Sequence, residues 1–477
     1  MAENTSQSQT NDTPKASDIE HRVKSLPPLM QAMQKHRLSE KISFHTPGHK
    51  GRLAELSPDF ELTGAMDLTE LPGLDDLSQP DGPLLALAKT ASAIYQSDQT
   101  LLSVNGATLA IMAAIISVGH AQRGERAAIL VPRNAHRCVI EALCLTDLTP
   151  IWYEPEFDHQ FNVWGQVNTD HLISVIQEHS TTNKIAMLVV VSPTYGGAVS
   201  DISAIAELAF RHNFVLLVDE AHGAHHIDGD RHKPACQLGA HLTAHSLHKT
   251  LSGLTQTGLL HISKDCPVPA SVLHETMMQL TSTSPSYLLM ASIEAALALI
   301  SSTKGKERIN SLFELGTDLK EQIKNLPDYQ LYATTSNTNS HVLIKHKNAD
   351  SASLIQHLVN HGIYAEAELG AGILLLLGIG TKTSDVTSLL NCLQNFTACG
   401  NQQAKPNNKP VALIAAMTPY AASRQARTTI PAKQALNRVA AEFLAPCPPG
   451  IPLIIPGQLI TREVLESTRK ELISVVV

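Results

Sequence analysis

A lysine and a carboxylate stand thirty positions apart in a pattern that suits one kind of chemistry. Asp219 ends the apolar run 214–218, and Lys249 follows later, three residues after Ser246. A lysine whose pKa is lowered by its pocket can form a Schiff base, and a carboxylate can keep a pyridine nitrogen protonated. Most lysines are solvated, so Lys249 alone would indicate little. The pair together predicts a pyridoxal phosphate (PLP) site.

Two further stretches suit the same cofactor. Residues 103–108, Ser-Val-Asn-Gly-Ala-Thr, precede a helix-like apolar run, so backbone amides and the Thr108 hydroxyl would lie at a helix N-terminus suited to a phosphate. The alternative is an ordinary N-cap by Asn105 or Thr108. His136 follows the strand-like run 127–131, where an imidazole could stack on a pyridine ring. The alternative for His136 is a structural or surface histidine.

Seven motifs, taken in order, make the chain resemble the bacterial PLP-dependent ornithine/lysine/arginine decarboxylases in their short form. The resemblance runs from about Leu26 to the C-terminus. The motifs are Phe44-His45-Thr46-Pro47-Gly48-His49-Lys50-Gly51, Leu71-Pro72-Gly73-Leu74-Asp75-Asp76-Leu77, residues 103–108, Ser192-Pro193-Thr194-Tyr195, residues 219–223, His248-Lys249 and Pro448-Pro449-Gly450-Ile451-Pro452.

The resemblance implies a role for each site residue. It makes Lys249 the Schiff-base lysine, Asp219 the partner of the pyridine nitrogen and His136 the stacking ring. It also implies that Ala107, Thr108 and Ser246 hold the phosphate, that Ala221 lies under the ring, that His222 lies near the ring substituents, that His248 lies beside the imine, and that Ser284 reaches the phosphate of a neighbouring subunit. A loop N-cap is the alternative for Ser284. The resemblance further implies a homodimer, or a multiple of dimers, with active sites at the interface.

The expected reaction is decarboxylation of a basic amino acid to a polyamine-type amine and carbon dioxide, with arginine ahead of lysine and ornithine. Only the resemblance selects this reaction, because the orientation of the bond to be broken decides what the cofactor does. Two alternatives stay open. One is another fold type I PLP enzyme, an aminotransferase or an aldolase, and the other is a catalytically silent PLP-binding homologue.

The substrate end of the site departs from the family pattern. Residues 446–458 look like a family motif that usually ends in glutamate, whereas this chain has Gln458. A buried ammonium or guanidinium needs a carboxylate partner, and a neutral amide pairs a charge less well. Either Asp75, Asp76 or Glu366 takes this role, or the substrate preference has changed. The alternative for each acid is a solvated surface carboxylate.

Composition and charge agree with a cytoplasmic enzyme. The chain has 477 residues, of which 43% are hydrophobic, enough for two or three domains. A net charge of -8 argues against a nucleic-acid partner. The seven cysteines show no paired short spacing, which indicates free thiols in a reducing compartment. We expect no membrane span, because no apolar run reaches about 18 residues.

The order of the patterns predicts an α/β fold. Beta-branched runs at 127–131, 185–191, 214–218 and 258–262 alternate with helical runs, which predicts a mostly parallel sheet covered by helices. With the resemblance, this indicates the PLP-dependent transferase fold type I with smaller α+β C-terminal domains. We expect a disordered tail (1–25), an N-terminal extension (26–90), a PLP-binding large domain (91–304), a small α+β domain (305–399), a linker (400–410) and a C-terminal domain that contributes to the active-site region (411–477).

The histidines at 222, 225 and 226 invite a metal interpretation, since imidazoles three and four positions apart can share a helix face. No carboxylate follows at a spacing that completes a zinc set. His245 and His248 are better explained by the cofactor lysine beside them. We therefore predict no metal site.

Overall fold

The computed structural model describes residues 42–44, 48, 50, 74–122, 127–227, 232–398, 411–445, 452–468 and 470–477. The predicted tail, the predicted linker and Pro448-Pro449-Gly450 lie outside these ranges, as do most residues of the two N-terminal motifs.

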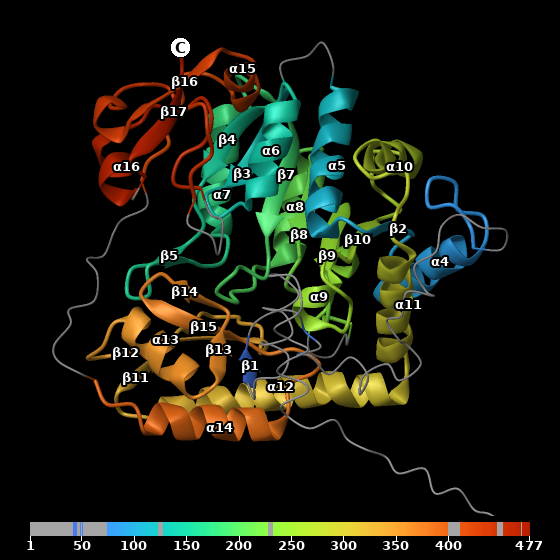
Figure 1. Ribbon diagram of the computed structural model, residues 1–477. Helices are drawn as coiled ribbons and strands as arrows, with labels where there is room; N and C mark the ends of the chain where they lie inside the picture. Colours follow the sequence, from blue (N-terminus) through green and yellow to red (C-terminus); the bar gives the residue numbers. More distant parts are fainter. Residues whose placement is uncertain are drawn as a thin grey trace, which may run out of the picture. The chain divides into compact units, whose positions relative to one another are not determined.

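A seven-stranded sheet forms the centre of the large domain (Figure 1). Six strands run in the same direction, and β10 runs antiparallel to both of its neighbours, so the sheet is mostly parallel as predicted. In spatial order the strands are β2 (Gln99–Ser103), β10 (Gly258–Ile262), β9 (Leu242–Ser246), β8 (Val215–Asp219), β7 (Lys184–Val191), β3 (Ala127–Pro132) and β4 (Thr149–Tyr153).

The apolar runs predicted as strands correspond to β3, β7, β8 and β10. The sequence does not reveal β2, β4 and β9, because polar residues interrupt their apolar pattern. Strand β9 is buried along its whole length, but its polar residues Thr243 and His245 break the apolar pattern expected of a buried strand. A strand of this kind is recognised only once its neighbours are in place.

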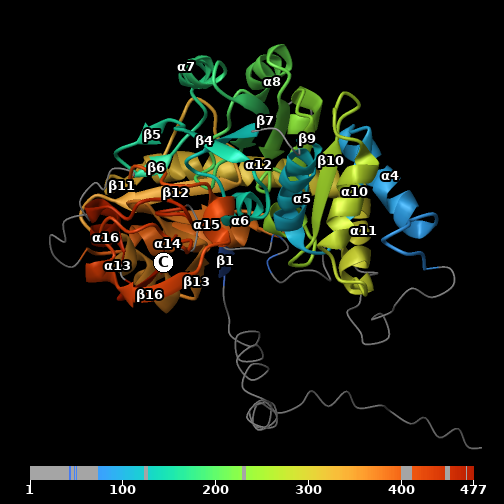
Figure 2. The same cartoon turned by 90° about the horizontal axis from the view of Figure 1, so that it is seen from above.

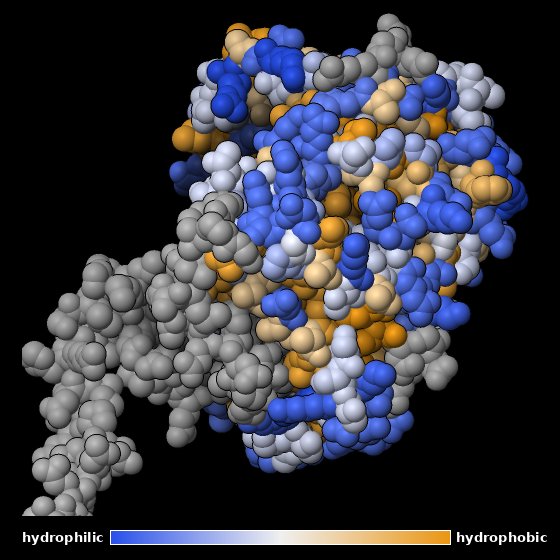
Figure 3. All heavy atoms as spheres, turned by 90° about the vertical axis from the view of Figure 1, so that its right-hand side faces the viewer, coloured by the Kyte–Doolittle hydropathy of each residue, from blue (hydrophilic) through white to orange (hydrophobic). Residues whose placement is uncertain are grey.

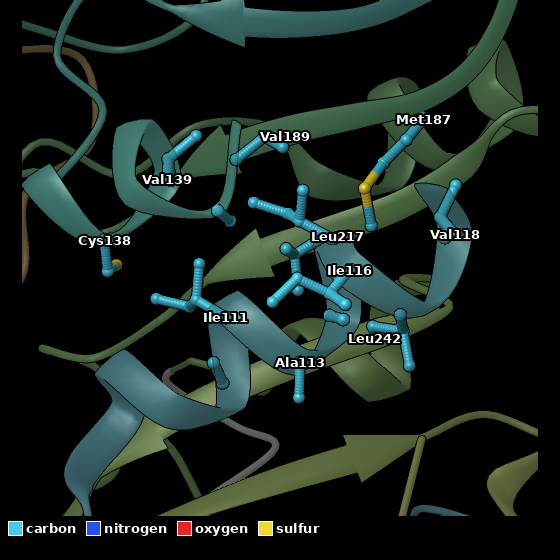
Figure 4. Packing of buried hydrophobic residues seen from close by; sticks show 14 of the residues in the cluster. Ile111, Ala113, Ile116, Val118, Cys138, Val139, Met187, Val189, Leu217 and Leu242 are labelled. Carbon is cyan, nitrogen blue, oxygen red and sulfur yellow. The ribbon is translucent and has the colours of Figure 1, made fainter. Parts of the chain in front are cut away.

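Helices cover both faces of the sheet (Figure 2). One face packs against α5 (Gly106–Ala121), α6 (Arg137–Leu145) and α10 (Ala270–Gln279), and the other against α7 (Thr169–His179) and α8 (Ile202–Arg211). Successive residues of a strand point to opposite faces, so Ile129 and Val131 join the first core, and Ala128 and Leu130 the second. Figure 4 shows the first core, where Ile111 and Ile116 of α5 meet Leu217 and Val189 of the sheet.

Further helices surround the large domain and lead into the small one. They are α4 (Pro83–Tyr95), α9 (Leu247–Thr250), α11 (Tyr287–Ser301) and α12 (Thr303–Lys324), with a 3-10 turn at Ala235–Leu238 and the short hairpin β5 (Phe157–Asp158) and β6 (Val163–Trp164). Within the described ranges no single helix is long and apolar enough to cross a membrane; α11 and α12 meet the criteria of length and composition only as a pair bent by 81°.

The small α+β part has an antiparallel sheet, β11 (Tyr329–Leu331), β12 (His341–His346), β15 (Gly372–Leu376) and β14 (Ala367–Leu369), with helices α13 (Ser351–Asn360) and α14 (Thr383–Gln394). The short strands β1 (Ile42–Phe44) and β13 (Ile363–Ala365) form a separate two-stranded sheet. The C-terminal part has the pair β16 (Arg427–Pro431) and β17 (Leu472–Val476), the helices α15 (Pro419–Ser423) and α16 (Arg462–Ser467), and a 3-10 turn at Ala432–Gln434.

Candidate active site

The carboxyl edge of the parallel strands brings the lysine and the carboxylate together. Asp219 is the last residue of β8, and Ser246 is the last residue of the adjacent parallel strand β9. The short helix α9 begins directly after Ser246 and carries His248 and Lys249. Ligands of open α/β sheets bind at this edge, because the strand ends and the loops that follow them face one crevice there.

Lys249 lies among groups that affect its charge. Its Nζ is 2.9 Å from Nε2 of His222. Burial lowers the pKa of Lys249 below its ordinary value, although the negative charges of Asp219 and Glu366 act in the opposite direction. A lysine with a lowered pKa more readily supplies the neutral amine that attacks a carbonyl.

His222 connects this lysine to the small domain. Its Nδ1 lies 2.9 Å from Nε2 of His341, a residue of β12, and the ring of Tyr195 packs edge-on against it at 5.1 Å. Burial, followed by the nearby Lys249 charge, lowers the pKa of His222 well below its ordinary value. A neutral His222 that accepts a hydrogen bond from Lys249 at Nε2 must carry its proton on Nδ1 and donate it to His341.

Asp219 and His136 lie close enough to Lys249 for their charges to interact with it. Asp219 is 5% exposed, and one of its carboxylate oxygens accepts a hydrogen bond from the Ala221 amide at 3.2 Å. His136 is the N-cap of α6, where its Nδ1 accepts from the Cys138 amide, and its side chain is exposed to solvent. The ring is therefore accessible from solvent.

The start of α5 has the features of a phosphate site. The helix begins at Gly106, earlier than the sequence run suggests, and the Asn105 side chain makes no cap hydrogen bond. The hydroxyl of Ser103 donates to the Gly106 carbonyl instead, at 2.8 Å, and the positive φ of Gly106 turns the chain there. The Gly106 amide donates to the Gln256 carbonyl, so among the described residues the next amides of α5, those of Ala107 and Thr108, are the ones left for an anion. The Thr108 side chain beside them is exposed, while Ala107 is buried.

Ser246 and His248 complete the same edge. The Ser246 hydroxyl lies 3.1 Å from Nδ1 of His248. The N-terminal motif contacts α9, because the Gly48 amide donates a hydrogen bond to the His248 carbonyl. A Cβ on Gly48 would overlap the Leu251 carbonyl oxygen, so this close approach requires glycine.

Comparison with known proteins assigns the chain to a family. The model described as Orn/Lys/Arg decarboxylase, major domain, matches residues 27–348, and the C-terminal domain of the same family matches residues 401–469. The chain belongs to the Orn/Lys/Arg decarboxylase family. The family assignment confirms the predicted relationship and the predicted enzyme class, a decarboxylase.

Individual relatives span nearly the whole chain. An arginine decarboxylase of Bacillus anthracis is 31% identical over 93% of both chains, and one of Bacillus subtilis is 29% identical over 91% of both. The inducible lysine decarboxylase of Escherichia coli is 23% identical over 94% of this chain and 78% of its own length. The lysine decarboxylase LdcF of Francisella novicida superposes with a TM-score of 0.73 at 20% identity, over 97% of this chain and 83% of that chain. This likeness confirms the predicted fold.

Among the acids considered for substrate binding, Glu366 lies beside the site. Its Oε1 accepts a hydrogen bond from the Tyr195 hydroxyl at 3.0 Å, and its charge acts on Lys249. Asp75 instead accepts four backbone amides at the start of α4, which hold its pKa at about 2 although burial opposes them. Asp76 accepts the Ser78 amide in the same turn. Asp75 and Asp76 therefore support the α4 loop.

Gln458 and Ser284 have other surroundings. Gln458 is 1% exposed, and its Oε1 has no hydrogen-bond partner among the described residues. Its backbone bonds to Ala440 and Ile455 place it within the C-terminal part. Ser284 is exposed in the loop between α10 and α11 and hydrogen-bonds to Ser282. The reach of Ser284 toward a second subunit stays a prediction.

Two site residues were not singled out from sequence, His341 and Tyr195. Tyr195 belongs to a family motif, and the available signal for His341 was a histidine opening an apolar strand. The three histidines considered for a metal have different partners: His222 faces Lys249, His225 faces Thr338, and His226 faces Glu220.

Proposed function

We propose that this family member decarboxylates a basic amino acid with PLP as its cofactor, with arginine preferred over lysine and ornithine. The observation that carries the proposal is the arrangement of Lys249, Asp219 and His222 at the carboxyl edge of the sheet, beside the uncapped start of α5. A structural lysine would not require a buried carboxylate and a neutral histidine around its amine.

The described residues fit PLP. The amides of Ala107 and Thr108, with the hydroxyls of Thr108 and Ser246, would hold the phosphate, and Lys249 would bind the aldehyde carbon. Asp219 would face the ring nitrogen, with His136 and Ala221 on either side of the ring and His222 near its substituents. When bound, PLP supplies an electron-accepting ring that stabilises negative charge at the substrate α-carbon.

The chain itself contributes charge and protons to the reaction. The half-buried Glu366 carboxylate would pair with the cationic end of the substrate, and the Tyr195 hydroxyl would hold that carboxylate in place. A proton must reach the α-carbon after carbon dioxide leaves, and Nζ of Lys249 or the ring of His248 would deliver it. His222 and His341 position the lysine amine without adding a charge beside it.

The preference for arginine is supported by the relatives. The arginine decarboxylase of Bacillus anthracis is 31% identical over 93% of both chains, whereas the inducible lysine decarboxylase of Escherichia coli is 23% identical. Glu366 supplies the carboxylate that Gln458 lacks, so loss of the usual family glutamate does not remove the charge partner.

The test is to incubate purified, PLP-loaded protein with equimolar arginine, lysine and ornithine and to identify the products by mass spectrometry. We expect agmatine in excess over cadaverine and putrescine. Keto acids or aldehydes would indicate an aminotransferase or an aldolase. An intact imine absorbance with no product would indicate a silent PLP-binding homologue.

A homodimer with active sites at the interface, acting in the cytoplasm, completes the proposal. Figure 3 shows apolar side chains gathered among polar ones on the side of the molecule that carries α4, α10 and α11. Leu280, 38% exposed, is the C-cap of α10 and begins the loop that leads to Ser284. Light scattering after size exclusion should give twice the chain mass, and Leu280→Glu should reduce it.

A further inference from the structure

A second group of ligand-type side chains lies in the small domain. His357 on α13, His361 at the C-cap of that helix and Cys392 on α14 each offer one ligand atom, and these atoms all lie within 4.8 Å of one another. Figure 1 shows α13 and α14 well separated from α9, the helix that carries Lys249. The cluster is therefore distinct from the candidate active site.

Backbone carbonyls fix which nitrogen of each histidine is free to bind. A carbonyl only accepts, so Nε2 of His357 donates its proton to the Cys392 carbonyl at 3.1 Å, which leaves the lone pair on Nδ1. Likewise Nδ1 of His361 donates to the His357 carbonyl at 2.8 Å, which leaves the lone pair on Nε2. Metal-binding histidines characteristically donate their other ring proton to a carbonyl or carboxylate in this way.

The positions of the three side chains suit an ion that enters from solvent. His357 and His361 are one helical turn apart with ring centroids 4.4 Å from each other. The Phe396 ring packs edge-on against His357 at 5.0 Å and restricts its orientation. Cys392 is buried, His357 is half-buried and His361 is exposed, so the cluster runs from a buried sulfur to the surface.

We propose that His357, His361 and Cys392 bind a divalent cation of the zinc class and thereby join α13 to α14. Two imidazoles and one thiolate are the ligands that Zn²⁺ prefers, and three protein ligands leave one position for water. Because the sulfur and the histidines come from different helices, the bound ion would hold these helices together. This site departs from the sequence-based expectation of no metal. The only signal for it in the sequence was the short His-x-x-x-His spacing of His357 and His361.

The test begins with PLP-loaded protein dialysed against a chelator. Zn²⁺ is then titrated in competition with a chromophoric chelator, and Co²⁺ is added in a separate difference-absorbance experiment. We expect one tight site per chain, a thiolate-to-cobalt charge-transfer band and a higher melting temperature with Zn²⁺, since an ion that binds only the folded state stabilises it.

Matched variants locate the site. Cys392→Ser should remove the cobalt band, and Cys392→Ser or His361→Ala should weaken Zn²⁺ binding by at least about 100-fold. Cys144→Ser, a half-buried cysteine on α6, and His212→Ala, an exposed histidine at the C-cap of α8, should leave binding unchanged.

Because His361 is exposed, its replacement should preserve the circular dichroism spectrum and so test binding independently of folding. The proposal is overturned if Co²⁺ gives no thiolate band, if Cys392→Ser binds Zn²⁺ as tightly as Cys144→Ser, or if His361→Ala binds as tightly as His212→Ala. None of these readouts depends on decarboxylation.

Discussion

Two chains of buried histidines include nearby residues of the loop after β8, His222 in one and Glu220 in the other, and direct their hydrogen bonds in opposite senses. The first begins at Lys249 and passes through His222 and His341 to the Ser340 hydroxyl, with separations of 2.9 Å at each step. A neutral His222 receives a hydrogen bond from the amine and passes its own proton onward. The donors therefore point away from Lys249, toward the small domain.

The second chain ends on the Glu220 carboxylate. Oε2 of Glu220 accepts from Nε2 of His245 at 2.9 Å, Nδ1 of His245 faces Nε2 of His261 at 3.0 Å, and Nδ1 of His261 faces the Thr100 hydroxyl at 2.9 Å. Oε1 of the same carboxylate lies 3.3 Å from Nδ1 of His226. When His245 donates from Nε2 and accepts at Nδ1, the donors run from Thr100 through His261 toward the carboxylate.

The contrast separates a chain that reaches the amine of Lys249, the proposed Schiff-base lysine, from a chain that ends on a buried carboxylate. Burial raises the pKa of Glu220, but the hydrogen bonds from His226 and His245 more than offset it, so the pKa is lowered overall. Glu220 therefore favours its ionised form, and its hydrogen bond with His245 joins the loop after β8 to β9. In the proposed reaction Lys249 exchanges protons, and neutral histidines beside it would leave it free to do so.

The largest expected effect is at the start of the first chain. Lys249→Ala should abolish both the imine absorbance and the production of amines, because Lys249 would supply the amine that binds the cofactor aldehyde. Amine products are measured by mass spectrometry, and the half-buried Lys345→Ala serves as the control. Full turnover in Lys249→Ala would remove the basis of the proposed function.

Glu220→Gln should lower the free energy of unfolding by about 3 kcal/mol, since His226 and His245 would lose a buried charged partner. Urea denaturation measures this loss. The exposed Glu207→Gln on α8 should change stability by less than about 0.5 kcal/mol. An equal, small effect of both substitutions would mean that the second chain does not support the fold.

The first histidine chain should affect how the free energy of unfolding depends on pH. Burial lowers the pKa of His341 well below its ordinary value of 6.5, so the folded state resists protonation there. The contribution of neutral His341 to the free energy of unfolding is fully present above about pH 6.5 and is lost as the pH falls below that value. His341→Gln should therefore reduce the slope of stability against pH by up to about 1.4 kcal/mol per pH unit between about pH 6 and 5. Urea denaturation at several pH values tests this; an unchanged slope would contradict a buried neutral His341.

The smallest expected effect is at the far end of the second chain. Thr100→Val keeps the side-chain shape but removes the hydroxyl that faces His261, and should cost about 1 kcal/mol. Thr90→Val, at an exposed position of α4, provides the control. Urea denaturation measures both; a Thr100→Val effect no larger than the control would show that the chain ends before β2.

Much of the catalytic arrangement could be predicted from sequence, because its residues follow strands in a regular order. Asp219 and Lys249 follow β8 and β9, and parallel strands present their carboxyl ends at one edge. His341 and Glu366 could not be placed in the same way. They come from the small domain, more than ninety positions after Lys249, and no local pattern relates them to it.

The sequence by itself determined the family, the mostly parallel sheet and the lysine–carboxylate pair, since these depend on local apolar patterns and on motifs that are contiguous in the chain. Only the tertiary structure decided that Glu366 rather than Asp75 lies beside Lys249, that Glu220 is held between two histidines, and that Cys392 meets His357 and His361. The physical reason is that charge pairing, desolvation and metal coordination depend on distances in space between residues that are remote in sequence.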